Sequence, residues 1–172
     1  HTIASEPAID DVYLGEVVCS KRDSFEFSFW KEIIKSLQDS GKKVIFSTLA
    51  LISNDYEINT IRKIMENTDL QIEANDMSAI ALFDGRVGNV GLLFNIYNEE
   101  SLKFLARKGV KEVTLPVETS FNALKTLAES TKIKLSVQVF GRMPLAISAR
   151  CYHARANNVS KINCGFVCAN DP

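Results

Sequence analysis

The four cysteines of the chain are the residues whose type and spacing could most directly do chemistry. Cys19 stands alone near the start, and the others follow the pattern Cys151-x12-Cys164-x3-Cys168. Four thiolates suit a [4Fe-4S] cluster, in which each iron takes three bridging sulfides and one soft protein sulfur. A tetrahedral zinc ion takes the same ligands, but zinc ribbons usually carry two C-x-x-C knuckles. The spacing favours a cluster and leaves zinc or simply buried thiols open.

Basic residues flank two of these cysteines. Lys21 and Arg22 follow Cys19 in a polar loop, and Arg150 directly precedes Cys151. A cation beside a thiolate lowers its pKa and offsets the negative charge of a bound cluster. The guanidinium groups of Arg22 and Arg150 could also bind a substrate carboxylate or phosphate through paired N–H donors. The alternative is an exposed ion pair of little energetic value.

Three glutamates are candidates for acid–base chemistry or for orienting basic side chains. Glu16, Glu73 and Glu118 each come near the end of an expected strand, and Glu118 is included among the candidate substrate-binding residues. Burial could separate their pKa values and so give them different protonation states. Orienting an Arg or Lys is the commoner use of such a carboxylate. A Ser-His-Asp order, an H-E-x-x-H motif and a P-loop are all absent from the sequence, so no catalytic residue is assigned.

Composition and charge narrow the class of protein. The chain has 172 residues, of which 46% are apolar and 24% charged, as in an ordinary globular domain. Lys plus Arg (20) nearly balances Asp plus Glu (21), which disfavours a nucleic-acid partner. No apolar run approaches the roughly 20 residues needed to span a bilayer, and the start lacks a secretory signal. We therefore expect a cytoplasmic protein, in which paired disulfides are uncommon.

The elements that must position these residues alternate along the chain. Short β-rich runs are followed by polar loops and then by helices with an apolar stripe, and Asn54 with Glu57 resembles a capping box. The pattern predicts strands at 12–17, 44–48, 70–74, 87–94, 112–115 and 134–140, and helices around 29–37, 58–65, 77–82, 102–106 and 121–128.

This alternation predicts an α/β fold with a parallel sheet. Right-handed crossovers make successive units curl the same way, so we expect a (β/α) barrel-like domain, an incomplete TIM-type barrel with six of eight strands. A doubly wound sheet is the alternative, although G-x-G-x-x-G is missing after the first strand. Loops at the carboxyl ends of barrel strands share one mouth, which would bring Cys19 and Cys151 to the same rim despite their separation in sequence.

Several segments resemble one known family. The runs VYLGE (12–16), VCSKR (18–22), STLAL (47–51), PVE (116–118), PLA (144–146) and SARC (148–151) are similar to the collagenase-like U-type peptidase family. Within this family, the segments resemble the bacterial members that act in oxygen-independent ubiquinone biosynthesis. By this comparison, residues 1–172 are a single barrel-like domain that lacks the family's first strand and C-terminal part.

The resemblance implies a function beyond what the residues alone indicate. It implies a [4Fe-4S] cluster on Cys19, Cys151, Cys164 and Cys168, and a heterodimer with UbiU that hydroxylates prenylated aromatic ubiquinone precursors without molecular oxygen. UbiT, a lipid-binding accessory protein, is a further implied partner. Two alternatives remain open: a peptidase of the same family, and a structural metal-binding subunit without its own catalysis.

Overall fold

The computed structural model describes residues 2–22, 27–66, 68–82, 85–144 and 146–170. Within these residues six parallel strands form one sheet in the order of the chain. The strands are β1 (Asp11–Leu14), β2 (Lys43–Ser47), β3 (Gln71–Ala74), β4 (Val87–Val90), β5 (Glu112–Thr114) and β6 (Lys134–Ser136).

Helices connect successive strands, and shorter helical turns occupy several loops. The helices are α1 (Thr2–Ser5), α2 (Phe27–Asp39), α3 (Asp55–Glu66), α4 (Met77–Leu82), α5 (Glu99–Arg107), α6 (Phe121–Ser130) and α7 (Tyr152–Ala156). The 3-10 turns are η1 (Ser20–Arg22), η2 (Leu92–Phe94) and η3 (Val167–Asn170).

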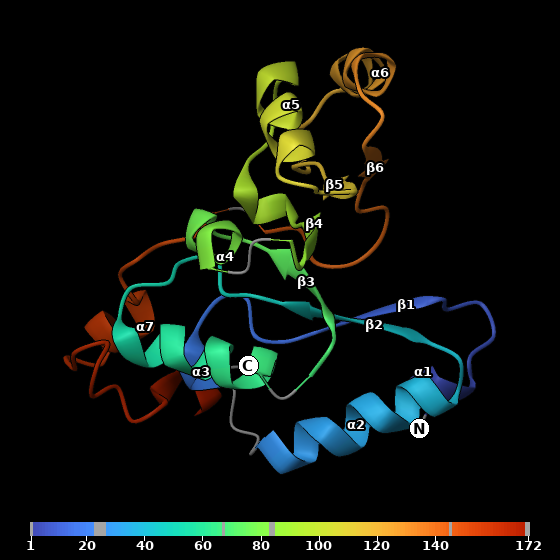
Figure 1. The fold of residues 1–172 in the computed structure, drawn as a ribbon. Helices are drawn as coiled ribbons and strands as arrows, with labels where there is room; N and C mark the ends of the chain where they lie inside the picture. The colour runs from blue at the N-terminus through green and yellow to red at the C-terminus, as the bar shows by residue number, and fades with distance from the viewer. Residues whose placement is uncertain (1, 23–26, 67, 83–84, 145, 171–172) are drawn as a thin grey trace.

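The sheet curls into half of a barrel, as Figure 1 shows from β1 at one side to β6 at the other. A doubly wound sheet would reverse its strand order at a switch point, and this order never reverses. The expected barrel-like α/β fold is therefore confirmed, and the doubly wound alternative is wrong.

Alternate strand residues build the core on the outside of the curl. Val12, Val44, Ile72 and Val113 are buried in one apolar cluster with side chains from the helices. Their neighbours in sequence point to the inner face, because successive side chains of a strand alternate between the two faces of a sheet. The inner face therefore receives the remaining strand residues, most of which are polar.

Three strands end three or four residues earlier than the sequence pattern predicts. β1 stops at Leu14 because Gly15 has φ 132°, and a Cβ there would lie 2.4 Å from the carbonyl oxygen of Ser47. β4 stops at Val90, and η2 begins two residues later, at Leu92. β6 stops at Ser136, and the expected continuation to residue 140 forms no ladder.

Candidate functional site

The loop that carries Cys19 is organised by Glu16. Glu16 Oε1 accepts hydrogen bonds from the backbone N–H groups of Val18 (2.7 Å) and Cys19 (3.0 Å). Its Oε2 lies 3.9 Å from Arg22 Nε, and Arg22 N donates to the carbonyl of Cys19 at 2.9 Å. Glu16 thus shapes the turn around the half-buried thiol of Cys19. Its contact with Arg22 corresponds to the second use considered for this carboxylate, the orientation of a basic side chain.

Buried Glu57 ties this loop to α3. Ser20 Oγ donates to Glu57 Oε1 at 2.8 Å, and the backbone N–H of Ser53 donates to Glu57 Oε2 at 2.8 Å. The side-chain oxygen of Asn54 accepts a hydrogen bond from the backbone N–H of Glu57 at 3.0 Å, as expected for a capping box. The return bond to the Glu57 carboxylate comes from the N–H of Ser53 instead of the N–H of Asn54. Burial would raise the pKa of Glu57, but the hydrogen bonds from Ser53 and Ser20 outweigh it and hold the pKa below its usual value.

Lys21 joins the first loop to the last segment of the chain. Its ammonium group donates to the carbonyl oxygen of Lys161 at 2.8 Å and also to that of Ile162. Ile162 lies two residues before Cys164. A contact across about 140 residues of sequence therefore places the loops of Cys19 and Cys164 side by side.

The segments of the other two cysteines meet the same region. Lys161 Nζ donates to the carbonyl oxygen of Ala149 at 3.3 Å, two residues before Cys151. Cys151 caps α7, and its Sγ accepts from the N–H of Ala154 at 3.4 Å. Helix α7 also contacts η3, which contains Cys168. In Figure 1 the C-terminal segment with α7 lies beside α3.

The structure thus gathers the four cysteine-bearing segments without placing their sulfur atoms as one ligand set. All four cysteines are free thiols, and Cys164 is the buried one. Among the described residues no group of three or more His, Cys, Asp or Glu side chains is positioned to hold a metal ion. Four thiols on loops already joined by hydrogen bonds are a donor set that fits a [4Fe-4S] cluster chemically.

A small pocket opens beside the first loop. It has a volume of about 120 Å³ and is lined by Glu16, Ser20, Thr48, Tyr56 and Glu57 together with residues of β2 and α3. Polar and apolar groups therefore both face a space next to Cys19.

The three residues considered for substrate binding have different surroundings. Arg22 is engaged with Glu16, and Glu118 accepts a 2.5 Å hydrogen bond from the hydroxyl of Tyr97. Arg150 is exposed. Within the described ranges no hydrogen bond or ion pair joins any two of these three side chains.

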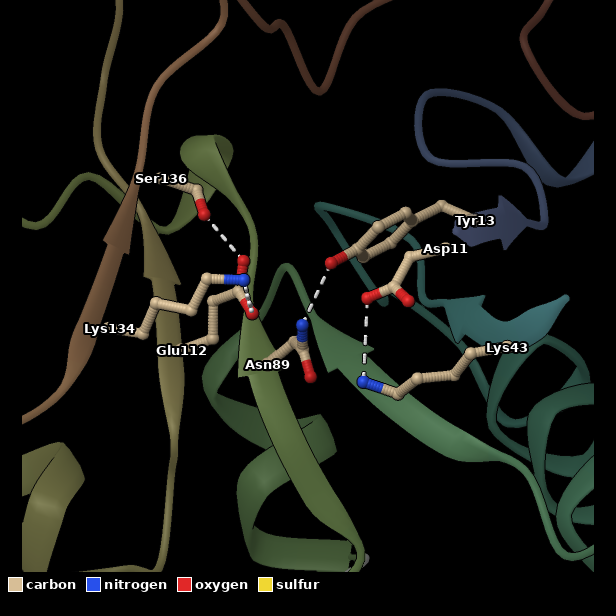
Figure 2. Close-up of polar contacts among 7 residues, drawn as sticks. All are labelled: Asp11, Tyr13, Lys43, Asn89, Glu112, Lys134 and Ser136. Atoms are coloured by element: carbon tan, nitrogen blue, oxygen red, sulfur yellow. Dashed lines mark hydrogen bonds and ion pairs between the residues drawn. The ribbon is translucent and has the colours of Figure 1, made fainter. Parts of the chain in front are cut away.

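Sequence reasoning missed a set of polar residues on the inner face of the sheet. Asn89 donates to the hydroxyl of Tyr13 at 2.8 Å, and Glu112 accepts from Ser136 Oγ and, at 3.2 Å, from Lys134. Figure 2 shows these side chains pointing from β1, β4, β5 and β6 toward the same space. Their signal in the sequence is the alternation of polar and apolar residues within each short strand.

Two inner-face groups titrate outside their ordinary ranges. Burial, together with the charges of Glu112 and Glu73, raises the pKa of Tyr13 to about 12. Burial also raises the pKa of Glu73, against hydrogen bonds from Ser47 (2.6 Å) and Asn75 (3.3 Å) that lower it. Both groups are therefore biased toward their neutral forms.

A curled parallel sheet with cysteine-bearing loops at its carboxyl ends defines a barrel-type α/β protein with a candidate metal centre at the mouth. The chain belongs to peptidase family U32, whose profile matches residues 2–171. No solved structure matches the chain. Among the described residues, none of the helices is long and apolar enough to cross a membrane.

Proposed function

We propose that this U32 protein is a UbiV-like iron-sulphur subunit that acts with UbiU in the oxygen-independent hydroxylation of ubiquinone precursors. Cys19, Cys151, Cys164 and Cys168 would hold a [4Fe-4S] cluster. The observation that carries the proposal is the hydrogen bond from Lys21 to the carbonyl of Lys161, because it joins the first cysteine loop to the last. Membership of the U32 family agrees with the proposal.

The chain's own residues would prepare the site in distinct ways. Glu16 holds the turn at Cys19 through two backbone N–H groups, and Glu57 anchors the following serine to α3. Lys161 connects the loop before Cys164 to the backbone before Cys151. When bound, a cluster of this type supplies one-electron transfer, at a potential set partly by nearby hydrogen bonds and solvent exposure.

The proposal includes partners and a place of action. The substrate would be a prenylated aromatic precursor, UbiU would complete the active heterodimer, and UbiT would deliver the lipid. The protein would act in the bacterial cytoplasm. These assignments are what the resemblance implies.

Peptidase activity is the second candidate, favoured by the name of the matched family. It predicts cleavage of peptide substrates by the isolated chain. An absence of turnover across peptides of varied sequence, at concentrations well above those of the enzyme, would count against it.

The test begins with anaerobic purification of the chain. Iron, acid-labile sulfide and zinc are measured with the visible spectrum, for the wild type and for Cys164→Ala. About four irons and four sulfides per chain, with a broad absorption lost in the variant, support the cluster. Ile162→Ala is the matched control, because this side chain is exposed in the same loop.

Function is then assayed with UbiU, a reductant and a prenylated phenol. Hydroxylation that requires both proteins and disappears in Cys164→Ala supports the proposal. Stoichiometric zinc in place of iron, or no metal after anaerobic reconstitution, would overturn the redox role.

A further inference from the structure

The pocket beside the first cysteine loop has an apolar wall. Four buried apolar side chains from β2, the residues after it and α3 form this wall: Phe46, Leu49, Ile61 and Ile64. An enclosed apolar cavity of about 150 Å³ holds a benzene molecule, and this pocket, at about 120 Å³, is similar in size. Water finds few hydrogen-bond partners along such a wall, so a compact hydrocarbon body would displace it favourably.

Thr48 adds a buried hydroxyl group to the lining of this pocket. The side chain of Ser47 reaches Glu73 on the inner face of the sheet, so Thr48 points to the outer face, where α3 packs. Thr48 is 0% exposed, and its Oγ1 accepts a hydrogen bond from the N–H of Asn75 at 3.1 Å. Among the described residues no group accepts a hydrogen bond from Thr48 Oγ1. The hydroxyl proton therefore remains available to a ligand.

Most of the other polar groups in the lining are already engaged. Ser20 Oγ donates to Glu57, and Thr60 Oγ1 donates to the carbonyl oxygen of Tyr56 at 2.9 Å. Tyr56 lies at the rim, where it is 74% exposed and water can serve its hydroxyl group. Within the part of the chain that the structure describes, Oε2 of Glu16 accepts no hydrogen bond. This oxygen can therefore take a proton from a ligand.

The charges of the pocket do not call for a charged ligand. Oε2 of Glu16 lies 3.9 Å from Arg22 Nε, and the positive charge of Lys161 acts on Glu57. A cationic ligand would compete with these protein cations, and an anionic one would be repelled by both carboxylates. The lining therefore favours an uncharged molecule that can both accept and donate a hydrogen bond.

We propose that this pocket binds a compact, uncharged ring that carries one hydroxyl group. The ring would pack against Phe46, Ile61 and Ile64. The oxygen of the ligand would accept a hydrogen bond from Thr48, and its proton would be donated to Oε2 of Glu16. The proposal rests on the lining of the pocket alone and stands whether or not the four cysteines hold a cluster.

Phenol, toluene and benzoate at neutral pH test the hydroxyl group and the charge of the ligand. Their dissociation constants are measured by titration of the amide resonances of the whole chain. Phenol should cause its largest shifts at Thr48, Leu49, Tyr56 and Thr60, and benzoate should bind at least about tenfold more weakly. Cyclohexanol asks which kind of ring the pocket prefers, because tighter binding than phenol would indicate a saturated ligand and weaker binding an aromatic one.

Thr60→Leu should weaken the binding of phenol about tenfold or more, because the larger side chain enters the pocket from α3. Thr126→Leu is the matched control. Thr126 donates to the carbonyl oxygen four residues before it, as Thr60 does, but it is exposed on α6. The control should leave the affinity for phenol unchanged.

Thr48→Val keeps the shape of the side chain and removes its hydroxyl group. It should weaken the binding of phenol about fivefold and leave toluene binding unchanged or tighter. The substitution also removes the acceptor for the N–H of Asn75. If this loss prevents Thr48→Val from folding, the wild-type shift map and Thr60→Leu decide the matter.

Three outcomes would overturn the proposal. The first is an absence of phenol shifts up to the solubility limit, or shifts centred on another surface such as that around Leu14 and Phe29. The second is an unchanged affinity for phenol in Thr60→Leu. The third is an equal loss for phenol and toluene in Thr48→Val, which would show that the pocket does not recognise the hydroxyl group.

Discussion

At the scale of single residues, the carboxylates near Cys19 act on the protein itself. Glu16 accepts from two backbone N–H groups of the turn, and Glu57 accepts from Ser20 and Ser53. A carboxylate that accepts several hydrogen bonds is stabilised in its charged form. These residues therefore belong to the framework that shapes the thiol loop.

Glu57→Gln should lower the free energy of unfolding in a pH-dependent way. The pKa of Glu57 is depressed below 4.5, so its contribution is fully present above that pH and is lost as pH falls through the lower folded-state pKa. We expect a loss of about 1–3 kcal/mol at neutral pH, shrinking in acid. Urea denaturation at several pH values measures it, with the exposed Glu66→Gln of the same helix as control. A loss that is constant with pH would contradict the role of the charge.

Tyr13 should ionise later than an ordinary tyrosine. Its folded-state pKa of about 12 exceeds the usual value of 10, so its contribution to stability is present below pH 10 and is lost as pH rises toward 12. Alkaline titration followed by ultraviolet absorbance should show a step near pH 12 that Tyr13→Phe removes. The pKa of Tyr97 is raised as well, by its hydrogen bond to Glu118, so the difference between wild type and variant isolates Tyr13. Glu112→Gln should move this step to lower pH, because the charge of Glu112 raises the pKa. An unchanged step in Glu112→Gln would show that the charge of Glu112 does not contribute to the raised pKa.

At the scale of elements, the existence of every strand was predictable, but the ends of three were not. The alternation of residues in β3 and the apolar stripe of α3 were strong signals. The early end of β1 depends on how closely Gly15 approaches the carbonyl of Ser47, a contact between strands that no local pattern reveals. Similarly, topology predicted that the loops of Cys19 and Cys151 share one rim. The Lys21 contact that joins the first loop to the last is a tertiary contact that no sequence pattern signals.

Gly15→Ala should be far more damaging than the same change at Gly41. Both glycines have positive φ, but the Cβ at Gly15 would lie 2.4 Å from a backbone oxygen, whereas nothing lies within 4 Å of a Cβ at Gly41. We expect a loss of about 2–3 kcal/mol for Gly15→Ala and about 1 kcal/mol for Gly41→Ala. Urea midpoints compare the pair, and equal losses would show that β1 and β2 can separate without cost.

Lys21→Met should loosen the last segment while leaving the sheet intact. The substitution keeps the length of the side chain and removes two hydrogen bonds to the carbonyls of Lys161 and Ile162. A local loss of about 1 kcal/mol corresponds to about fivefold faster proteolysis in residues 157–170. Mass spectrometry of the fragments locates the cuts, and the same substitution at the exposed Lys35 of α2, Lys35→Met, is the control. Cleavage that begins in the strands instead would point to global unfolding.

At the scale of the whole molecule, the fold separates two regions with different chemistry. The thiol-bearing loops lie beyond the carboxyl end of the sheet, and the polar inner face lies within its curl. The sequence revealed the first because cysteines are rare and conspicuous. It concealed the second because Tyr13, Asn89 and Glu112 belong to short strands far apart in sequence, and only the curvature of the sheet brings them together.

If the four cysteines hold a cluster, the cluster also links the loop of Cys19 to the segment of residues 151–168. Metal binding to sites that are unformed in the unfolded chain adds its free energy to local order. Anaerobic reconstitution should therefore slow amide hydrogen exchange in residues 17–22 and 151–168, with little change in α5 and α6, which lie away from the loops in Figure 1. Chelation of the metal should reverse the effect, and Cys164→Ala should abolish it. Uniform slowing across the sheet would instead indicate global stabilisation. No slowing in a fully loaded protein would show that Lys21, Lys161 and Glu57 already hold these loops without the metal.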